Sequence, residues 1–218
     1  TVALTAAEPG ATIRYTTESG QDAREGLLYE KPLVLNRTTE LLFIATDGTR
    51  TSPVVTANFT AINHNWQIVP GSVPNAQYTA GGPDALIDGR RGPEDWRTGA
   101  WQGFEGQDFL VTLNLNEPTP VQRAGLGLLQ DMRSWIFMPR EVIVEVSQDG
   151  QTFVPAGRQS HDVPDNMEGV FRRDLIVDLD GTTIRALRFR AVNYGPCPDW
   201  HPGAGGETFI FVDELIVQ

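Results

Sequence analysis

The chain has 218 residues, a formal net charge of −11 and a pI near 4.6. A protein this acidic lacks the basic surface that nucleic acids and anionic membranes require, so we expect neither as a partner. No apolar run approaches the roughly 20 residues that span a bilayer, and a single cysteine, Cys197, excludes an internal disulfide.

Residues 1–62 show the alternation of apolar and polar side chains that is typical of short strands separated by turns. The predicted strands are 1–6, 11–17, 27–29, 31–35, 40–46 and 54–60, and Asp47-Gly48 is a tight-turn signal. Because no helical periodicity appears, we predict a small sandwich of the immunoglobulin or fibronectin type III kind. Since the alternation begins at residue 1, we expect the chain to be a piece of a longer polypeptide.

Residues 63–218 predict a second, larger domain. Residues 81–96 form a loop rich in glycine, proline and carboxylates, and strands then follow at regular spacing, as in a larger sandwich. The predicted strands are 66–69, 109–115, 123–129, 141–147, 169–179, 184–191 and 209–217. We therefore predict an all-β chain of two domains, 1–62 and 63–218.

The last predicted strand, 209–217, is apolar on both faces, which indicates burial on both sides. Regular alternation places Phe209, Phe211, Leu215 and Val217 on one face, and Ile210, Val212, Glu214 and Ile216 on the other. An ionised Glu214 among aliphatic neighbours is costly unless a cation or hydrogen-bond donors meet it. Two explanations stay open, a salt bridge with an arginine and a bound metal ion.

The loop before this strand, 193–208, contains three prolines and four glycines, so it forms neither a helix nor a regular strand. It still carries large amphipathic rings, which surface loops use to bind ligands. A sugar site needs aromatic platforms beside planar hydrogen-bonding groups. The candidate glycan contacts are Trp101, Arg133, Trp135, Tyr194, Trp200 and His201. The alternative is that Trp101 and Trp200 merely fill space between the loops.

No arrangement of residues indicates catalysis. Asp213 and Glu214 are adjacent on a strand and point to opposite faces, so they cannot flank one glycosidic bond. Cys197 and His201 supply only two ligands, whereas a zinc site needs more. The sequence also lacks a phosphate-binding loop, a nucleophile elbow and a His-Glu-x-x-His string. We therefore predict no catalytic residues.

Several strings of residues resemble known families. The strings 10–20, 28–33 and 45–48 resemble the small sandwich appended to bacterial chitobiases and β-hexosaminidases, although Glu-Ser-Gly replaces the usual Asp-Gly and proline. The strings 85–89, 113–115, 146–150 and 211–215 resemble the discoidin-like jelly roll, the coagulation factor 5/8 C-type domain that also serves as family 32 carbohydrate-binding modules. This resemblance covers residues 81–218 and implies a jelly-roll β-sandwich for the second domain.

Three further strings, 101–106, 134–139 and 197–206, resemble the C-terminal domain of bacterial family 20 β-N-acetylhexosaminidases. The resemblance implies a non-catalytic region of a periplasmic, cell-surface or secreted enzyme. It further implies that this region targets the catalytic domain to glycans containing hexosamine or galactose. A scaffold that packs on the catalytic domain without binding sugar is the alternative, and a small enzyme in its own right is a third class.

The discoidin resemblance also implies a structural calcium ion at the loop 81–96, a site of oxygen ligands that suits this metal. The implied ligands are the side chains of Asp88 and Glu214 and the carbonyl groups of Ala85, Arg90 and Asp213. Here the loop is longer than is usual in the family, and Arg90 or Arg91 replaces a common asparagine. That difference leaves the contributions of Pro93 and Glu94 open. The alternative is a salt bridge from Asp88 or Glu214 to one of these arginines.

Overall fold

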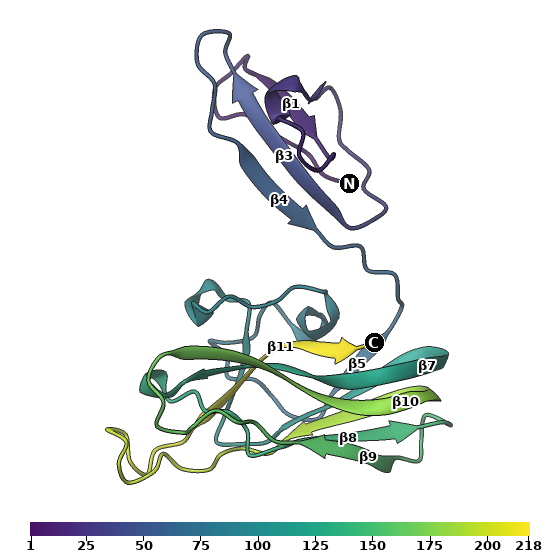
Figure 1. Cartoon of the computed structure of the whole chain (residues 1–218), viewed down its shortest axis with the longest axis vertical. Coiled ribbons are helices and arrows are strands. Elements are labelled where there is room, and N and C mark those ends of the chain that lie inside the picture. Colours follow the sequence, from purple (N-terminus) through teal and green to yellow (C-terminus); the bar gives the residue numbers. More distant parts are fainter. The chain divides into compact units, whose positions relative to one another are not determined.

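The computed structural model describes residues 1–218 and divides them into two compact units, residues 1–63 and 64–218 (Figure 1). Both units consist of antiparallel strands, and the only helices are four short 3-10 segments. The predicted all-β fold is thereby confirmed. None of the helical segments has the length and hydrophobicity that a membrane crossing would require.

Unit 1, residues 1–63, contains a four-stranded sheet of order β2-β1-β3-β4. Its elements are β1 (Thr12–Thr16), η1 (Ala23–Glu25), β2 (Leu27–Leu28), β3 (Thr39–Thr46) and β4 (Val55–Phe59). The predicted strands 1–6 and 31–35 are reduced to one isolated bridge, in which Val2 and Leu33 exchange two hydrogen bonds of 2.8 Å. The first segment contains two alanines, which offer little cross-strand contact and are depleted in strands.

Unit 2, residues 64–218, is built from seven strands and three 3-10 helices. The strands are β5 (Gln67–Pro70), β6 (Gln102–Glu105), β7 (Phe109–Asp131), β8 (Val142–Ser147), β9 (Val154–Gln159), β10 (Val170–Ala191) and β11 (Phe209–Val217). The helices are η2 (Pro83–Ile87), η3 (Trp96–Thr98) and η4 (Met132–Ser134). The long strands β7 and β10 pair with each other side by side along unit 2 (Figure 1).

Each long strand contributes to two layers. The first part of β7 pairs with β5 and with the end of β10, which also pairs with β8, and β8 pairs with β9. The second part of β7 pairs with the start of β10 and with β11, which pairs with β6. Between the two parts, Asn116 and Asp180 have positive φ values of 64° and 52°, and the register between β7 and β10 is interrupted. The four predicted strands 109–115, 123–129, 169–179 and 184–191 are therefore two bent strands.

The two layers enclose one hydrophobic core, which confirms the predicted sandwich. Val111, Leu113, Val144 and Phe189 come from the first layer, and Leu126, Leu128, Leu175, Val177, Ile210 and Val212 come from the second. All are buried in a single cluster. Alternation along each strand places the intervening side chains on the outer face of the layer.

The last strand departs from regular alternation. The register of β11 against β7 shifts between Val212 and Leu215, which marks a bulge at Asp213-Glu214. A bulge adds one residue and reverses the faces beyond it. Leu215 and Val217 therefore pack in the same core as Ile210 and Val212, and the predicted grouping of Leu215 and Val217 with the phenylalanines is wrong. The predicted burial on both sides is correct.

The edge strands β6 and β9 were not expected from the sequence. Pro155 and Gly157 in β9 argue against a strand, but β9 pairs only with β8, and a sheet edge tolerates proline. The predicted turn at Asp149-Gly150 joins β8 to β9, and the Asp149 carboxylate accepts hydrogen bonds from the N–H groups of Gln151 and Thr152.

Candidate functional site

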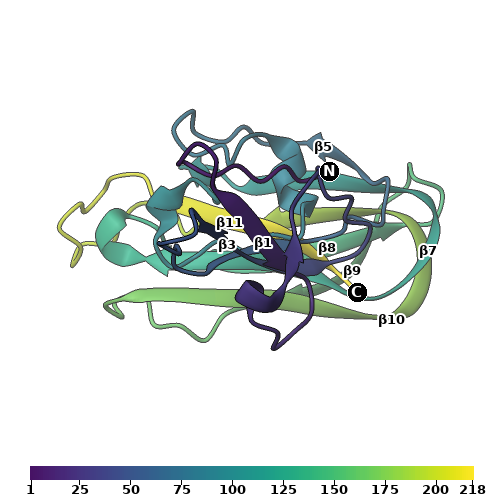
Figure 2. The same cartoon turned by 90° about the horizontal axis from the view of Figure 1, so that it is seen from above.

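The loop 193–208, between β10 and β11, projects beyond the strand ends in both views of unit 2 (Figures 1 and 2). It folds back on itself, because Cys197 and Gly206 face each other: the Cys197 N–H donates to the Gly206 carbonyl over 2.7 Å, and the Gly205 N–H donates to the Cys197 carbonyl over 2.9 Å. At its base the Thr208 hydroxyl donates to the Gly195 carbonyl over 2.7 Å. As predicted, the loop is neither a helix nor a regular strand.

His201 fixes this loop from inside. His201 is only 3% exposed. Its Nδ1 accepts a hydrogen bond from the Gly203 N–H over 3.0 Å, and its Nε2 lies 2.7 Å from the Met132 carbonyl of η4. The first contact assigns the proton to Nε2, which donates to that carbonyl. Both ring nitrogens are therefore occupied, and the prediction of a sugar contact for His201 is wrong. Instead it ties the loop to η4.

Trp135 lies at the C-terminus of η4, with its backbone in the left-handed region at φ 65°. Its ring packs on the backbone of the loop 193–208 at two glycines. A Cβ atom on Gly203 would come within 2.4 Å of the ring, and one on Gly206 within 2.5 Å. Trp135 nevertheless remains 39% exposed. The glycines thus hold one part of the indole and leave the rest accessible.

Replacing Gly203 with alanine should disturb this contact. The added methyl group has no room beside the Trp135 ring, and overpacking of this kind costs about 1–3 kcal/mol. We expect a lower melting temperature and a changed indole fluorescence. Ala204→Ser, at the exposed neighbouring position, is the control and should leave both unchanged. Equal effects of the two variants would show that the Trp135 contact is unimportant.

Phe137 is the centre of the aromatic cluster and was not among the predicted site residues. It is buried, stacks on Tyr194 with ring centroids 4.8 Å apart, and lies 5.6 Å from the His201 ring and 6.4 Å from the Trp200 ring. Trp200 lies at the rim and is 50% exposed. A buried floor with two exposed indoles, Trp135 and Trp200, is the arrangement of an aromatic binding platform.

Tyr194, which stacks on Phe137, is itself held by neighbouring polar side chains. Its hydroxyl donates to Asp165 over 2.9 Å, and the Arg140 guanidinium lies 5.4 Å from its ring centroid. Burial, followed by the Asp165 carboxylate, raises the pKa of the Tyr194 hydroxyl. Arg140 also donates from Nε to the Tyr194 carbonyl over 2.9 Å. These contacts hold Tyr194 in place, with its hydroxyl already engaged.

Arg133 lies in η4 and pairs with Glu168 at 2.7 Å across the same end of the unit. Both side chains are largely exposed, so the pair adds little to stability and is free to exchange partners. Trp101, in contrast, is 1% exposed and its indole N–H donates to the Pro93 carbonyl over 2.9 Å. It belongs to another buried cluster, so the prediction of a sugar contact for Trp101 is wrong.

The predicted metal ligands lie at the opposing segments 83–92 and 213–214. Glu214 Oε1 accepts from the Gly89 N–H over 3.1 Å, whereas Oε2 is buried and has no partner. Burial raises the pKa of Glu214 to about 8, and the nearby charge of Asp88 adds to this rise. An unpaired, buried carboxylate oxygen beside a second carboxylate is the donor chemistry of a hard cation. Nowhere in the structure do three or more His, Cys, Asp or Glu gather in a cluster that could hold a metal ion, so carbonyl groups would have to complete the coordination.

The arginines of this loop do not neutralise Glu214. Arg90 pairs with Asp88 at 3.9 Å on the surface, and Arg91 turns to two other carboxylates. Arg91 Nε donates to the fully buried Asp213 over 3.0 Å, and its Nη2 donates to Asp174 over 2.5 Å. The hydrogen bonds to Asp174 and Asp213 raise the pKa of Arg91. The sequence prediction gave Asp213 only a carbonyl role and missed this triad.

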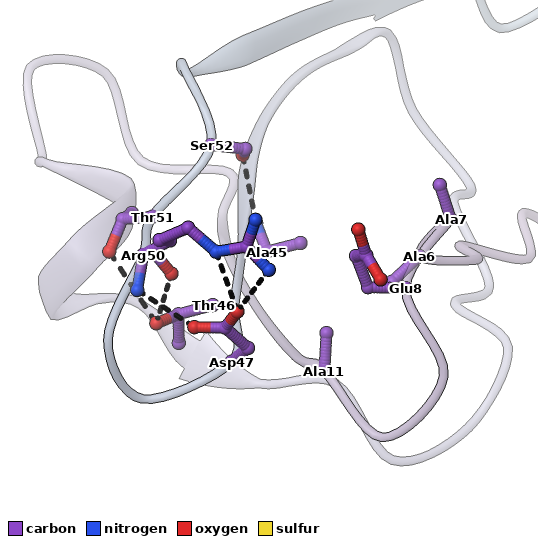
Figure 3. A pocket seen from close by; sticks show the side chains of 10 residues that line it. All are labelled: Ala6, Ala7, Glu8, Ala11, Ala45, Thr46, Asp47, Arg50, Thr51 and Ser52. Carbon is purple, nitrogen blue, oxygen red and sulfur yellow. Dashed lines mark hydrogen bonds and ion pairs between the residues drawn. The ribbon is translucent and has the colours of Figure 1, made fainter.

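Unit 1 contains a separate small pocket of about 290 Å³ (Figure 3). Alanines line much of it, with Glu8 on one side and the Asp47–Arg50 pair on the other (Figure 3). Arg50 Nη2 lies 2.8 Å from Asp47, whose carboxylate also accepts from the Thr49 N–H over 3.0 Å. These bonds close the turn predicted at Asp47-Gly48, so the Asp47 and Arg50 side chains have a structural role there.

Comparison with known proteins gives a different result for each unit. No curated protein matches the chain. The chain is similar to the module CpGH89CBM32-5 from Clostridium perfringens in complex with GalNAc-β-1,3-galactose, at 16% identity over 70% of this chain and 94% of that chain, with a TM-score of 0.44. It is similar to the family 32 module of NanJ from C. perfringens in complex with galactose, at 12% identity over 70% and 92%, with a TM-score of 0.43.

A third similar structure is the C-terminal domain of a chitobiase from Bacteroides fragilis, at 18% identity over 72% of this chain and 95% of that chain, with a TM-score of 0.42. For unit 1, the family model described as Fn3 associated matches residues 2–59. The sequence resemblance had pointed there to the sandwich of chitobiases and β-hexosaminidases. The matched model covers nearly all of unit 1 and none of unit 2.

Proposed function

We propose that unit 2 is a non-catalytic glycan-binding module whose binding surface is formed by Trp135 and Trp200. The observation that carries the proposal is the exposure of these two indoles, whose rings both lie against the buried ring of His201, with Trp200 also lying 6.4 Å from the Phe137 ring. Amphipathic rings held at the surface on a rigid base are typical of ligand-binding surfaces. The apolar C–H face of a sugar ring is a suitable partner for an indole.

The polar groups around these rings match the hydroxyl groups of a sugar. Arg133 and Glu168 offer donors and acceptors at the same end of the unit, and their exposed ion pair can open at little cost. A single shallow site of this kind binds weakly, and a dissociation constant near 1 mM corresponds to about −4 kcal/mol. Glycans containing hexosamine or galactose are the proposed ligands.

The proposed parent is a bacterial family 20 β-N-acetylhexosaminidase that acts in the periplasm, at the cell surface or after secretion. Two of the three strings that resemble this family, 134–139 and 197–206, contact each other through Trp135, Phe137 and His201. In this proposal the module holds the catalytic domain close to its substrate. Upstream coding sequence for a barrel domain with a neighbouring Asp-Glu pair would support this parent, and an unrelated catalytic domain would contradict it.

A structural calcium ion is proposed to join the loop 83–92 to β11. Asp88 and Glu214 would hold it by side chain, with the carbonyl groups of Ala85, Arg90 and Asp213 completing the set. When bound, the ion would supply positive charge to the unpaired oxygen of Glu214. Because the ion would join two segments that are more than 100 residues apart in the sequence, its proposed role is to stabilise unit 2, with no chemical step.

Isothermal titration of the intact chain tests the glycan proposal. Galactose, N-acetylglucosamine, GalNAc-β-1,3-galactose and chitooligosaccharides should be titrated separately, and at least one should give saturable heat. The same samples should show no turnover of an aryl N-acetylglucosaminide, which tests for a small enzyme. Absence of heat with every sugar would contradict the proposal, and turnover would contradict its non-catalytic character.

A scaffold role for unit 1 is the second candidate, and one observation favours it. Leu27, Leu28 and Val34 are exposed, at 68%, 47% and 78%, around one surface depression. An exposed apolar patch of this kind is typical of a surface that packs against another domain. Leu27→Ser/Val34→Ser should weaken association with the separately expressed catalytic domain in sedimentation experiments. Unchanged association would exclude this patch as the contact.

A further inference from the structure

We propose that the outer face of the five-stranded layer of unit 2 is a second glycan-binding surface, which accepts a neutral oligosaccharide. An open groove of about 680 Å³ lies there, lined by strands β5, β7, β8 and β10 and by residues 71–72 and 107–108. None of its lining residues belongs to η4 or to the loop 193–208. The groove is therefore separate from the surface formed by Trp135 and Trp200.

Strand register places four side chains in one row across this face. Val69 pairs with Thr112, Thr112 pairs with Arg188, and Arg188 pairs with Glu145. Neighbouring strands lie about 4.8 Å apart, so a row over four strands extends roughly 14 Å. The residues before and after Thr112, Glu145 and Arg188 point into the core, which makes this part of the row a rigid feature of the sheet. Its length suits a short oligosaccharide.

Arg188 and Glu145 keep hydrogen-bonding capacity for a ligand. Arg188 donates from Nη1 to Glu145 Oε2 over 3.2 Å, and its guanidinium lies 3.9 Å from the Phe153 ring centroid, which fixes its plane. Nε and Nη2 of Arg188, Oε1 of Glu145 and Oγ1 of Thr112 make no other hydrogen bond in the structure. A row of fixed donors and acceptors matches the adjacent hydroxyl groups of a sugar.

A second ion pair stands beside this row. Arg190 donates from Nε to Asp108 over 2.8 Å, and the other oxygen of Asp108 accepts from the Asn193 N–H over 2.8 Å. Arg190 pairs across the sheet with Leu110, which lines the groove together with Val69. The groove thus combines fixed polar groups with apolar side chains that can contact the C–H groups of a sugar.

The balance of charge favours a neutral ligand. Two guanidinium groups and two carboxylates cancel within the groove, and the chain as a whole carries a formal net charge of −11. Uronic acid chains and sulfated glycans would therefore meet repulsion without a compensating positive patch. A neutral chain meets no such repulsion.

The test is a titration of the ¹⁵N-labelled intact chain with neutral chitooligosaccharides and galactooligosaccharides, followed by NMR. The backbone N–H signals of Thr112, Glu145 and Arg188 should shift and saturate. Arg188→Gln/Glu145→Gln, which keeps the net charge, should weaken this response at least fivefold. The matched control is Arg158→Gln/Glu141→Gln, an ion pair of 3.4 Å that lies outside the groove, and it should leave the response unchanged.

Trp200→Ala distinguishes this groove from the surface formed by Trp135 and Trp200, since it should weaken only the response of Trp135 and its neighbours. Persistent groove shifts in that variant support the second surface even if the loop end binds no sugar. The inference is overturned if the backbone N–H signals of the groove residues do not shift at saturating sugar, or if they shift equally in both double variants. Shifts with charged glycans alone, or with protein concentration in the absence of sugar, also overturn it.

Discussion

Replacing Trp200 with alanine is expected to weaken glycan binding by the surface formed by Trp135 and Trp200 at least tenfold, because the more exposed of its two indoles is removed. Trp200 is 50% exposed and contacts the cluster only at its rim. An aromatic contact is worth up to about 1.5 kcal/mol beyond its buried area, which corresponds to roughly tenfold in affinity. Isothermal titration of the variant and of the parent chain measures the difference.

The same variant should retain its fold. Because half of the Trp200 surface is exposed, its removal leaves no large cavity, and the melting temperature should change little. Val154→Ala, an exposed apolar position on β9, is the control and should alter neither binding nor melting. Full affinity in Trp200→Ala would exclude this ring as a platform. A large loss of stability would show instead that Trp200 is a packing residue.

Calcium is expected to stabilise the protein most strongly above about pH 8, where the buried Glu214 side chain is ionised and its charge needs a cation. The pKa of Glu214 rises from 4.5 to about 8 through burial, so the folded state binds its proton more tightly than the unfolded state does. The contribution of Glu214 to the free energy of unfolding is therefore complete below the unfolded-state pKa and is lost as the pH rises through about 8. Each pKa unit corresponds to about 1.4 kcal/mol of unfolding free energy, and because water screens the partly exposed Glu214 side chain, the loss is at most a few kcal/mol.

Thermal melts with a chelator and with excess calcium, at about pH 5.5 and about pH 8.5, measure this linkage. Calcium at a hundredfold excess over its dissociation constant adds about 2.7 kcal/mol to the free energy of unfolding. This raises the melting temperature of a protein of this size by on the order of 5 °C or more. Glu214→Gln removes the titrating group and should abolish both the pH-dependent loss and the calcium effect. Glu141→Gln, a carboxylate elsewhere in unit 2, should preserve both. An identical calcium response in Glu214→Gln would exclude Glu214 as a ligand.

The sequence was sufficient to predict elements whose signal is local. Strand β11 begins and ends where its apolar run does, and Asp47-Gly48 and Asp149-Gly150 mark the turns that the structure contains. The loop 193–208 was recognised because proline and glycine exclude regular structure there. These features depend on neighbouring residues, which a single sequence displays directly.

Features that depend on distant residues were not predicted. The bulge at Asp213-Glu214 is set by pairing with β7, and the proline in β9 is acceptable only because that strand lies at an edge. The same limit applies to the candidate site. Trp101 and Trp200 have similar glycine-rich surroundings in the sequence, yet one is buried and the other exposed. The role of Phe137 became visible only when η4 and the loop 193–208 were seen to meet at its ring.

The most direct test of glycan binding by Trp135 and Trp200 observes the five tryptophan side chains at once. Each indole N–H gives a separate NMR signal, which can be followed during titration of the intact chain with GalNAc-β-1,3-galactose or N-acetylglucosamine. We expect the signals of Trp135 and Trp200 to shift and saturate, while the signals of the buried Trp101 and of Trp96, whose N–H is bonded to Asp131, stay in place. Stationary Trp135 and Trp200 signals with every sugar would contradict it.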